Sequence, residues 1–126
     1  MDDLNKNRPL SPHLQVYKWQ LSSLLSITHR LTSIINTAGV TLICFWILSL
    51  SMGEDCYKYF AMFSSSILGK FILVGFTWSF CYHLLNGLRH LFWDMGYGYE
   101  IKTANFSGIL VLTSSFLLTI ILWVIS

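Results

Sequence analysis

The sequence predicts an all-α integral membrane protein with three transmembrane helices, on the evidence of its composition and of three long apolar runs. Hydrophobic residues make up 54% of the 126 residues and charged residues only 11%, against about 25% charged residues in a soluble domain. Each crossing of a bilayer takes about 20 apolar residues, so about 60 residues are needed for the membrane. This leaves no room for a soluble catalytic domain.

The first transmembrane helix is expected at residues 22–50, because residues 31–50 form an apolar run without charge. A polar loop, residues 51–60, is expected to follow it. The preceding segment, residues 1–21, contains acidic residues and both prolines, and fits neither a secretory signal nor a transit peptide. The first helix would then serve as an uncleaved insertion signal, which favours a bacterial inner membrane or an organelle-encoded protein of the mitochondrial inner membrane.

The second and third transmembrane helices are expected at residues 63–92 and 106–125, so that residues 22–126 form one three-helix membrane anchor. The second run is interrupted by Lys70 near its start and by a polar cluster at residues 83–90. The long stem of Lys70 can carry its charge to the membrane surface. The third run contains no charged residue.

The distribution of basic residues predicts the orientation in the membrane. The basic residues before or within the start of the first helix are Lys6, Arg8, Lys18 and Arg30, whereas the next loop offers Lys58 and Lys70 beside two acidic residues. The positive-inside rule therefore places the N-terminus in the cytoplasm or the matrix of this multi-pass protein. The net charge of +2 is too small to indicate a nucleic-acid partner. Membrane lipid is the expected surrounding.

A histidine and further polar residues interrupt the second helix in the sequence YHLLNGLRHLFWDMGYG. Ionisable side chains at the bilayer centre cost about 2.5 to 3.5 kcal/mol, so each one suggests a function. Arg89 and His90 are expected at the membrane interface, whereas His83 lies about 9 Å deeper. At that depth an imidazole suits an axial haem ligand, and Gly87 leaves a bare patch for a flat macrocycle. Alternatively, His83 hydrogen-bonds a neighbouring helix and Gly87 serves close packing.

A second polar cluster, SSLLSITHRLTS, opens the first helix. Ser26, His29 and Arg30 are three or four residues apart, so their side chains can point into one pocket. Ser26 and Arg30 suit the carbonyl oxygen of a quinone, and Arg30 equally suits a carboxylate such as a haem propionate. The structural alternative is a serine that caps the helix and an arginine that marks the inner membrane face. Asp94 is expected to pair with Arg89 or Arg30.

With the segment RPLSPHLQVYK, the two clusters resemble the large cytochrome b556-type anchor subunits of succinate dehydrogenase, respiratory complex II. The resemblance covers nearly the whole chain and is closest to the alphaproteobacterial and mitochondrial branch. Ser33 stands where the family usually has glycine, which bears on how closely helices pack there. The hydroxyl before it, Thr32, is kept. The motifs are Arg8-Pro9, Ser26-x-x-His29-Arg30 and His83-x-x-x-Gly87-x-Arg89-His90-x-x-x-Asp94-x-Gly96.

The resemblance implies that His83 is an axial ligand of haem b. The second axial histidine would come from a smaller anchor subunit, so the chain would form half of a heterodimeric haem-binding helix bundle. Independently, no other helix offers a histidine at the expected depth of His83. The resemblance also implies that Ser26 and Arg30 bind ubiquinone, and that His29, Arg30 and His90 lie near the haem propionates.

The function so implied is that of the anchor of succinate:ubiquinone oxidoreductase, in the respiratory chain and the tricarboxylic acid cycle. Succinate would be oxidised on a flavoprotein subunit, and electrons would reach the quinone through an iron–sulfur subunit. The chain itself would position cofactors and contribute no catalytic residue. The alternatives are the anchor of a quinol:fumarate reductase, a haem-free structural anchor, and a small ion-conducting module, which the uncharged third helix disfavours.

Overall fold

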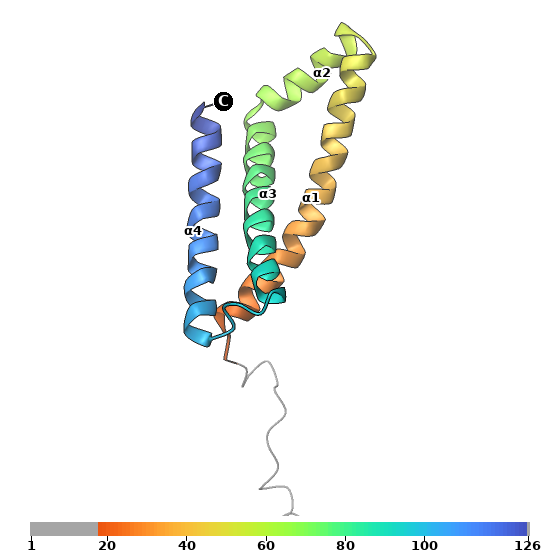
Figure 1. The fold of residues 1–126 in the computed structure, drawn as a ribbon. Coiled ribbons are helices and arrows are strands. Elements are labelled where there is room, and N and C mark those ends of the chain that lie inside the picture. Colours follow the sequence, from red (N-terminus) through yellow and green to blue (C-terminus); the bar gives the residue numbers. More distant parts are fainter. Residues whose placement is uncertain (1–17, 126) are drawn as a thin grey trace, which may run out of the picture.

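The computed structural model describes residues 18–125, and this part of the chain folds into four helices (Figure 1). They are α1 (Leu21–Ser51), α2 (Glu54–Ser65), α3 (Ile67–Asp94) and α4 (Ile101–Ile125). Helices α1, α3 and α4 are long and apolar enough to cross a membrane, which confirms the predicted all-α class with three transmembrane helices. The Arg8-Pro9 motif and most of the predicted N-terminal segment lie outside the described residues.

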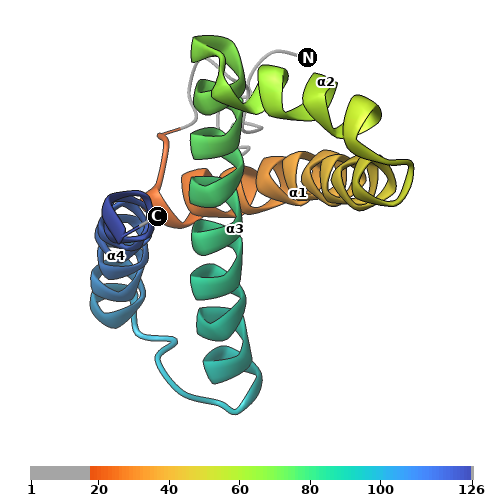
Figure 2. The same ribbon diagram turned by 90° about the horizontal axis from the view of Figure 1, so that it is seen from above.

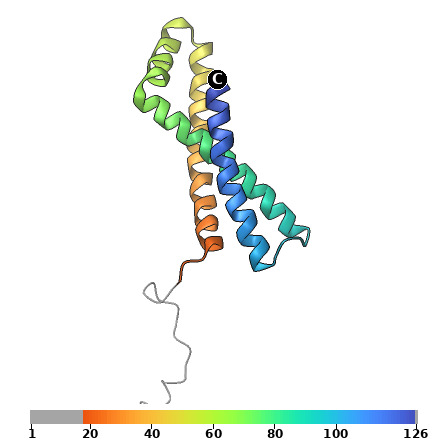
Figure 3. The same cartoon turned by 90° about the vertical axis from the view of Figure 1, so that its left-hand side faces the viewer.

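The three long helices run in alternating directions. The start of α1, the end of α3 and the start of α4 lie at the same end of the molecule (Figure 1). Helix α1 leans away from α3 and α4 toward its far end in Figure 1, and α2 leads the chain back from there to α3. Seen from the other two directions, α3 crosses α1 (Figures 2 and 3). The half of the molecule in which α1 begins carries both polar clusters.

Helix α2 replaces the loop that we expected after the first helix, so that expectation is wrong. Gly53 precedes the helix with a φ of 102°, a conformation that glycine adopts without a steric penalty. Glu54 and Asp55 occupy the first turn, where negative charge stabilises a helix. Lys58 Nζ lies 3.6 Å and 3.3 Å from their carboxylate oxygens. The charged residues Glu54, Asp55 and Lys58 indicated a loop in the sequence, but in the structure they stabilise the start of α2.

A break at Ser66 separates α2 from α3, so α3 begins later than the expected residue 63. The side chain of Ser66 accepts a hydrogen bond from the backbone N–H of Gly69 at 3.0 Å, as an N-terminal cap does. A side chain at Gly69 would collide with the carbonyl oxygen of Phe63. The apolar run of the sequence is therefore divided between two helices. Helix α4 begins earlier than expected, at Ile101.

The buried core is small and lies where α1, α3 and α4 meet. Helix α4 approaches α1 at Gly108, because the absence of a side chain there leaves room for Leu25. Most large apolar side chains elsewhere on the long helices are exposed, as expected of helices surrounded by lipid or by other membrane helices. The core consists of Leu25, Tyr82 and Val111, packed against Leu21, Trp78, Leu85 and Leu112.

Polar side chains of α3 reach across to α1 where the two helices cross. The hydroxyl of Tyr82 donates to the carbonyl oxygen of Leu25 at 2.8 Å. The hydroxyl of Ser79 lies 3.2 Å from the carbonyl oxygen of Thr32 and 2.9 Å from Oδ1 of Asn36. Buried hydroxyl groups need such partners, and hydrogen bonds between helices stabilise packing within a membrane. These bonds fix α1 against α3 beside the polar clusters.

Candidate functional site

Three histidine rings gather where α1 crosses α3. The ring of His29 on α1 stacks on that of His83 on α3, with centroids 4.0 Å apart and an angle of 6° between the planes. The ring of His90 on α3 lies 5.3 Å from that of His29, at an angle of 56°. The two polar clusters of the sequence therefore form one site.

His29 lies beside His83, so our expectation that no other helix offers a histidine at this depth is wrong. Helix α1 begins at Leu21, which puts His29 about two turns inside it. Helix α3 runs in the opposite direction and crosses α1 at this level. Position in the sequence indicates the depth of a residue within its own helix, whereas the crossing point of two helices is set by their packing.

The surroundings of His83 are polar on one side and open near the next turn. Oγ1 of Thr32 lies 3.1 Å from Nδ1 of His83. One turn further along α3, a methyl group added at Gly87 would meet no atom of the described residues within 4 Å beyond its chain neighbours and the backbone of its own helix. The chain itself therefore leaves α3 bare beside this histidine.

The second ring of the stack, that of His29, has an unsatisfied nitrogen. Its Nδ1 is buried and has no hydrogen-bond partner among residues 18–125. Leaving a buried polar atom unpaired costs about 1 to 3 kcal/mol, so such atoms usually have a partner. A group outside the described residues is the natural partner for this nitrogen.

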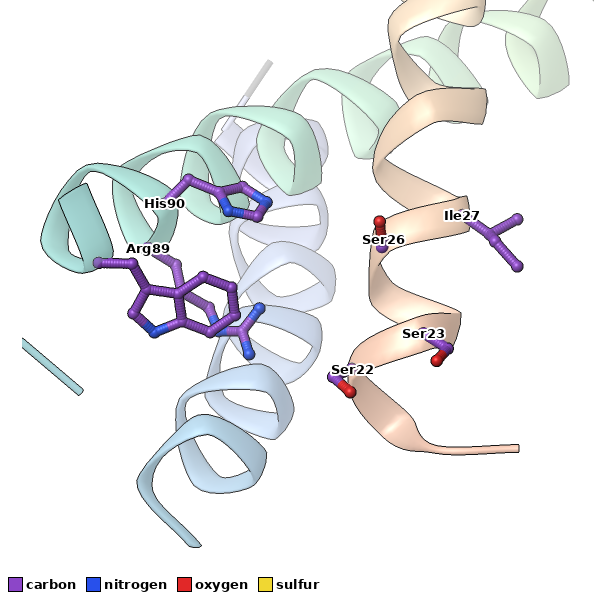
Figure 4. A pocket seen from close by; sticks show the side chains of 7 residues that line it. Ser22, Ser23, Ser26, Ile27, Arg89 and His90 are labelled. Atoms are coloured by element: carbon purple, nitrogen blue, oxygen red, sulfur yellow. The ribbon is translucent and has the colours of Figure 1, made fainter. Parts of the chain in front are cut away.

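A pocket of about 390 Å³ lies beside the histidines, between the start of α1 and the end of α3 (Figure 4). Ser26 lines it from α1, and the hydroxyl of this residue forms no hydrogen bond within residues 18–125. His90 lines it from α3 and points toward α1 in Figure 4. The full lining consists of Ser22, Ser23, Ser26, Ile27, Arg89, His90 and Trp93.

Arg30 does not line this pocket, and its side chain is exposed on the next turn of α1. Asp94 is also exposed, and within residues 18–125 it forms no ion pair with Arg30 or Arg89, so the expected pairing is wrong. Ser33 is exposed as well, and its hydroxyl donates to the carbonyl oxygen of Arg30 at 2.6 Å. Its side chain therefore does not obstruct the packing of α1 against α3.

Arg89 lies five residues before the end of α3 and is buried, with 6% of its surface exposed. Its Nε donates to the hydroxyl of Ser107 at 2.9 Å, and its Nη2 donates to the carbonyl oxygen of Ala104 at 2.9 Å. The guanidinium also lies 4.0 Å from the centre of the Trp93 ring. Arg89 thus joins the end of α3 to the start of α4 and forms one wall of the pocket.

Two residues of the site, Asn86 and Thr32, were not predicted from the sequence. Asn86 is fully buried, and its amide lies 3.4 Å from both Arg89 Nη1 and His90 Nε2. Its position three and four residues before them on one helix was the available signal. Thr32 was noted only as a kept hydroxyl, and its contact with His83 depends on how two helices cross.

Comparisons with known proteins show the family of the chain. Residues 4–122 match the family described as succinate dehydrogenase/fumarate reductase transmembrane subunit. The succinate dehydrogenase cytochrome b556 subunit of Rickettsia prowazekii is 46% identical over 122 residues, covering 97% of this chain and 95% of the relative. That of Paracoccus denitrificans is 42% identical, covering 96% and 94%. The mitochondrial cytochrome b560 subunit of Sus scrofa is 38% identical over 114 residues, covering 87% and 66%.

Proposed function

We infer the function of this chain from its family, because it belongs to the succinate dehydrogenase/fumarate reductase transmembrane subunits, as a cytochrome b anchor of succinate dehydrogenase. We propose that it holds haem b through His83. We also propose that it borders the ubiquinone-reduction site with Ser26 and Arg30. It is a multi-pass membrane subunit of complex II. When bound, haem b supplies a centre that takes up and releases one electron. The residues of this chain supply binding, orientation and charge.

The observation that carries the haem proposal is the position of His83 beside open space. The metal-binding lone pair of an imidazole lies in the plane of its ring, whereas His29 stacks on the face of that ring. His29 therefore does not block the direction in which His83 would bind iron. The bare backbone at Gly87 leaves room on the same helix for a flat macrocycle. The residues present therefore fit the group.

The face-to-face stack of His29 and His83 leaves no room for a metal between the two rings, so the proposal gives only His83 a ligand role in this chain. We therefore assign the second axial histidine to the smaller anchor subunit, with which this chain forms the haem-binding bundle.

The residues around the stack suit the haem propionates. The unpaired Nδ1 of His29 is a buried group in need of a hydrogen-bond partner, and a propionate provides one. Arg30 follows His29 directly and carries a guanidinium that binds carboxylates through two hydrogen bonds. His90 lies on the other side of His29 and completes this polar neighbourhood.

The pocket at Ser26 suits the head group of ubiquinone. The hydroxyl of Ser26 is free to donate to a quinone carbonyl oxygen. Negative charge develops on the quinone oxygens as the molecule is reduced. Arg30, on the next turn of α1 outside the pocket lining, would stabilise that charge once its long side chain turns toward the head group. The positive charge of Arg89 in the pocket wall acts in the same direction.

The pocket lies at the end of the molecule where α1 begins, and this position indicates where the other subunits of the complex would bind. This end faces the cytoplasm or the matrix in the orientation that the basic residues favour. The iron–sulfur subunit would dock at this end and pass electrons to the quinone, and the flavoprotein subunit would carry the succinate chemistry. The chain would then lie in a bacterial or mitochondrial inner membrane.

A reduced-minus-oxidised spectrum of the purified complex tests the haem assignment. Exchange of His83→Phe removes the ligand and keeps a ring of similar size, so the b-type signal should be lost or altered. The control variant Leu84→Phe, at the exposed next residue of the same helix, should keep the b-type signal. Electron transfer from succinate to a soluble dye verifies that the other subunits are still present. An unchanged spectrum in His83→Phe would overturn the assignment and favour a haem-free structural anchor.

A further inference from the structure

We propose that Thr32 is the positioning residue of the haem site, and that its hydroxyl fixes the tautomer and the orientation of His83. This inference rests on the proposed role of His83 as an axial ligand. It concerns residues of this chain alone: the hydroxyl of Thr32 on α1 and the imidazole of His83 on α3, which lie 3.1 Å apart.

The direction of this hydrogen bond follows from counting protons. The hydroxyl of Thr32 has one proton, and it donates that proton to the carbonyl oxygen of His29 at 2.9 Å. A carbonyl oxygen only accepts, and we assign the hydroxyl proton to that bond. With this assignment the contact between Thr32 and His83 takes its proton from the imidazole, with Nδ1–H donating to Oγ1. The inference thus puts the proton of His83 on Nδ1 and leaves the lone pair of its Nε2 for a metal.

Thr32 is held firmly enough to orient the ring. It is only 1% exposed, so water cannot replace His83 as the partner of its hydroxyl. Its carbonyl oxygen also contacts the hydroxyl of Ser79 at 3.2 Å, on the same helix as His83. Its β-branched side chain has few rotamers in a helix. Thr32 is thus fixed by its own helix and by α3.

The hydrogen bond has a consequence for the redox properties of the haem. An imidazole that donates its second N–H to an oxygen becomes a more basic ligand and favours the oxidised metal. Removing the acceptor should therefore raise the midpoint potential of the haem. It should also free the ring to turn about the bond to iron.

The test compares three variants of the assembled complex by redox titration of the b-type spectrum. Thr32→Val removes the acceptor and keeps the shape of the side chain, and its midpoint potential should shift upward. Thr32→Ser restores a hydroxyl and should return the potential to that of the unchanged complex. Thr37→Val is the matched control, because the hydroxyl of Thr37 bonds only to the carbonyl oxygen of Ser33 on its own helix. Its potential should stay unchanged.

A second readout follows the orientation of the ring directly. The electron paramagnetic resonance signal of the oxidised haem depends on how the axial imidazoles are turned, so it should change in Thr32→Val and not in Thr37→Val. A potential and a signal that both stay unchanged in Thr32→Val would overturn the inference. If Thr32→Val does not assemble, Thr32→Cys takes its place, since sulfur is a weak acceptor and a smaller upward shift is expected. An unshifted potential in that variant would equally overturn the inference.

Failure of this inference is distinguishable from failure of the proposed function. If His83 is not an axial ligand, His83→Phe keeps its b-type spectrum. If His83 is the ligand and Thr32 does not orient it, His83→Phe loses or alters the b-type signal, whereas Thr32→Val behaves like Thr37→Val.

Discussion

The imidazole of His29 stacks on that of His83 at a centroid distance of 4.0 Å, with the two planes only 6° apart. The stacked rings bring the start of α1 into contact with the second half of α3. The two rings have different surroundings: His83 has the hydroxyl of Thr32 at its Nδ1, whereas the Nδ1 of His29 has no partner within residues 18–125. Two neighbouring histidines are thereby suited to two different roles.

Exchange of His29→Phe should lower the midpoint potential of the haem. Phenylalanine keeps an aromatic ring on His83 and removes the nitrogen that we assign to a propionate. A propionate without this hydrogen bond presents more negative charge to the haem, which favours the oxidised state. Redox titration of the b-type spectrum measures the shift, whose direction is opposite to that expected for Thr32→Val. A potential that rises or stays constant would contradict the propionate role of His29.

Exchange of Ser26→Ala should weaken quinone reduction and leave the succinate chemistry intact. The variant removes one hydroxyl from the pocket and disturbs no hydrogen bond within residues 18–125. A hydrogen bond to a reacting oxygen contributes about 1.5 to 3 kcal/mol when the oxygen is charged, so the loss in rate should be about tenfold or more. The measurements are succinate-to-ubiquinone and succinate-to-dye electron transfer in the same preparation.

Ser33→Ala is the control for this prediction. Ser33 is exposed, and its hydroxyl bonds only to the carbonyl oxygen of Arg30 on its own helix. Both activities should therefore stay unchanged in this variant. Equal quinone reduction in Ser26→Ala and Ser33→Ala would exclude Ser26 from the quinone site.

Exchange of Arg89→Lys should destabilise the anchor while the charge is kept. The guanidinium of Arg89 reaches Ser107 and Ala104 of α4 at the same time, and a single ammonium group cannot reproduce that fork. The loss of a hydrogen bond from a charged donor costs about 1.5 to 3 kcal/mol. The midpoint of thermal haem loss in detergent should fall, and it should not fall in Lys102→Arg, whose side chain is exposed. Equal midpoints in the two variants would show that the fork adds nothing to stability.

Exchange of Gly108→Ala should also lower this midpoint, by forcing α1 and α4 apart. The added methyl group would collide with Leu25, a core residue that is 1% exposed. Overpacking of this kind costs about 1 to 3 kcal/mol. Gly75→Ala is the matched control within a helix, because a side chain there meets no atom of the described residues within 4 Å. If the midpoint falls equally in both variants, the replacement of a helical glycine explains the effect, and the contact with Leu25 does not.

Much of the fold could be predicted from the sequence, and the exceptions have identifiable reasons. The three long helices followed from apolar length, since a bilayer accepts few other structures. The short helix α2 was missed because Glu54 and Asp55 were interpreted as loop residues, although acidic residues also favour the start of a helix. The late start of α3 depends on the cap at Ser66, a single hydrogen bond that hydrophobic periodicity does not reveal.

The candidate site, like the fold, could be predicted from the sequence only in part. The sequence by itself determined which residues are candidates for the site, because a polar side chain in an apolar helix is costly and stands out: His83, Ser26, His29, Arg30 and His90 could all be named. Only the tertiary structure decided how they meet. It stacked His29 on His83, put Thr32 against Nδ1 of that ring, and buried Arg89 against α4. The reason is that the spacing of residues fixes neighbours within one helix, whereas the crossing of two helices depends on the shapes of all the side chains packed between them.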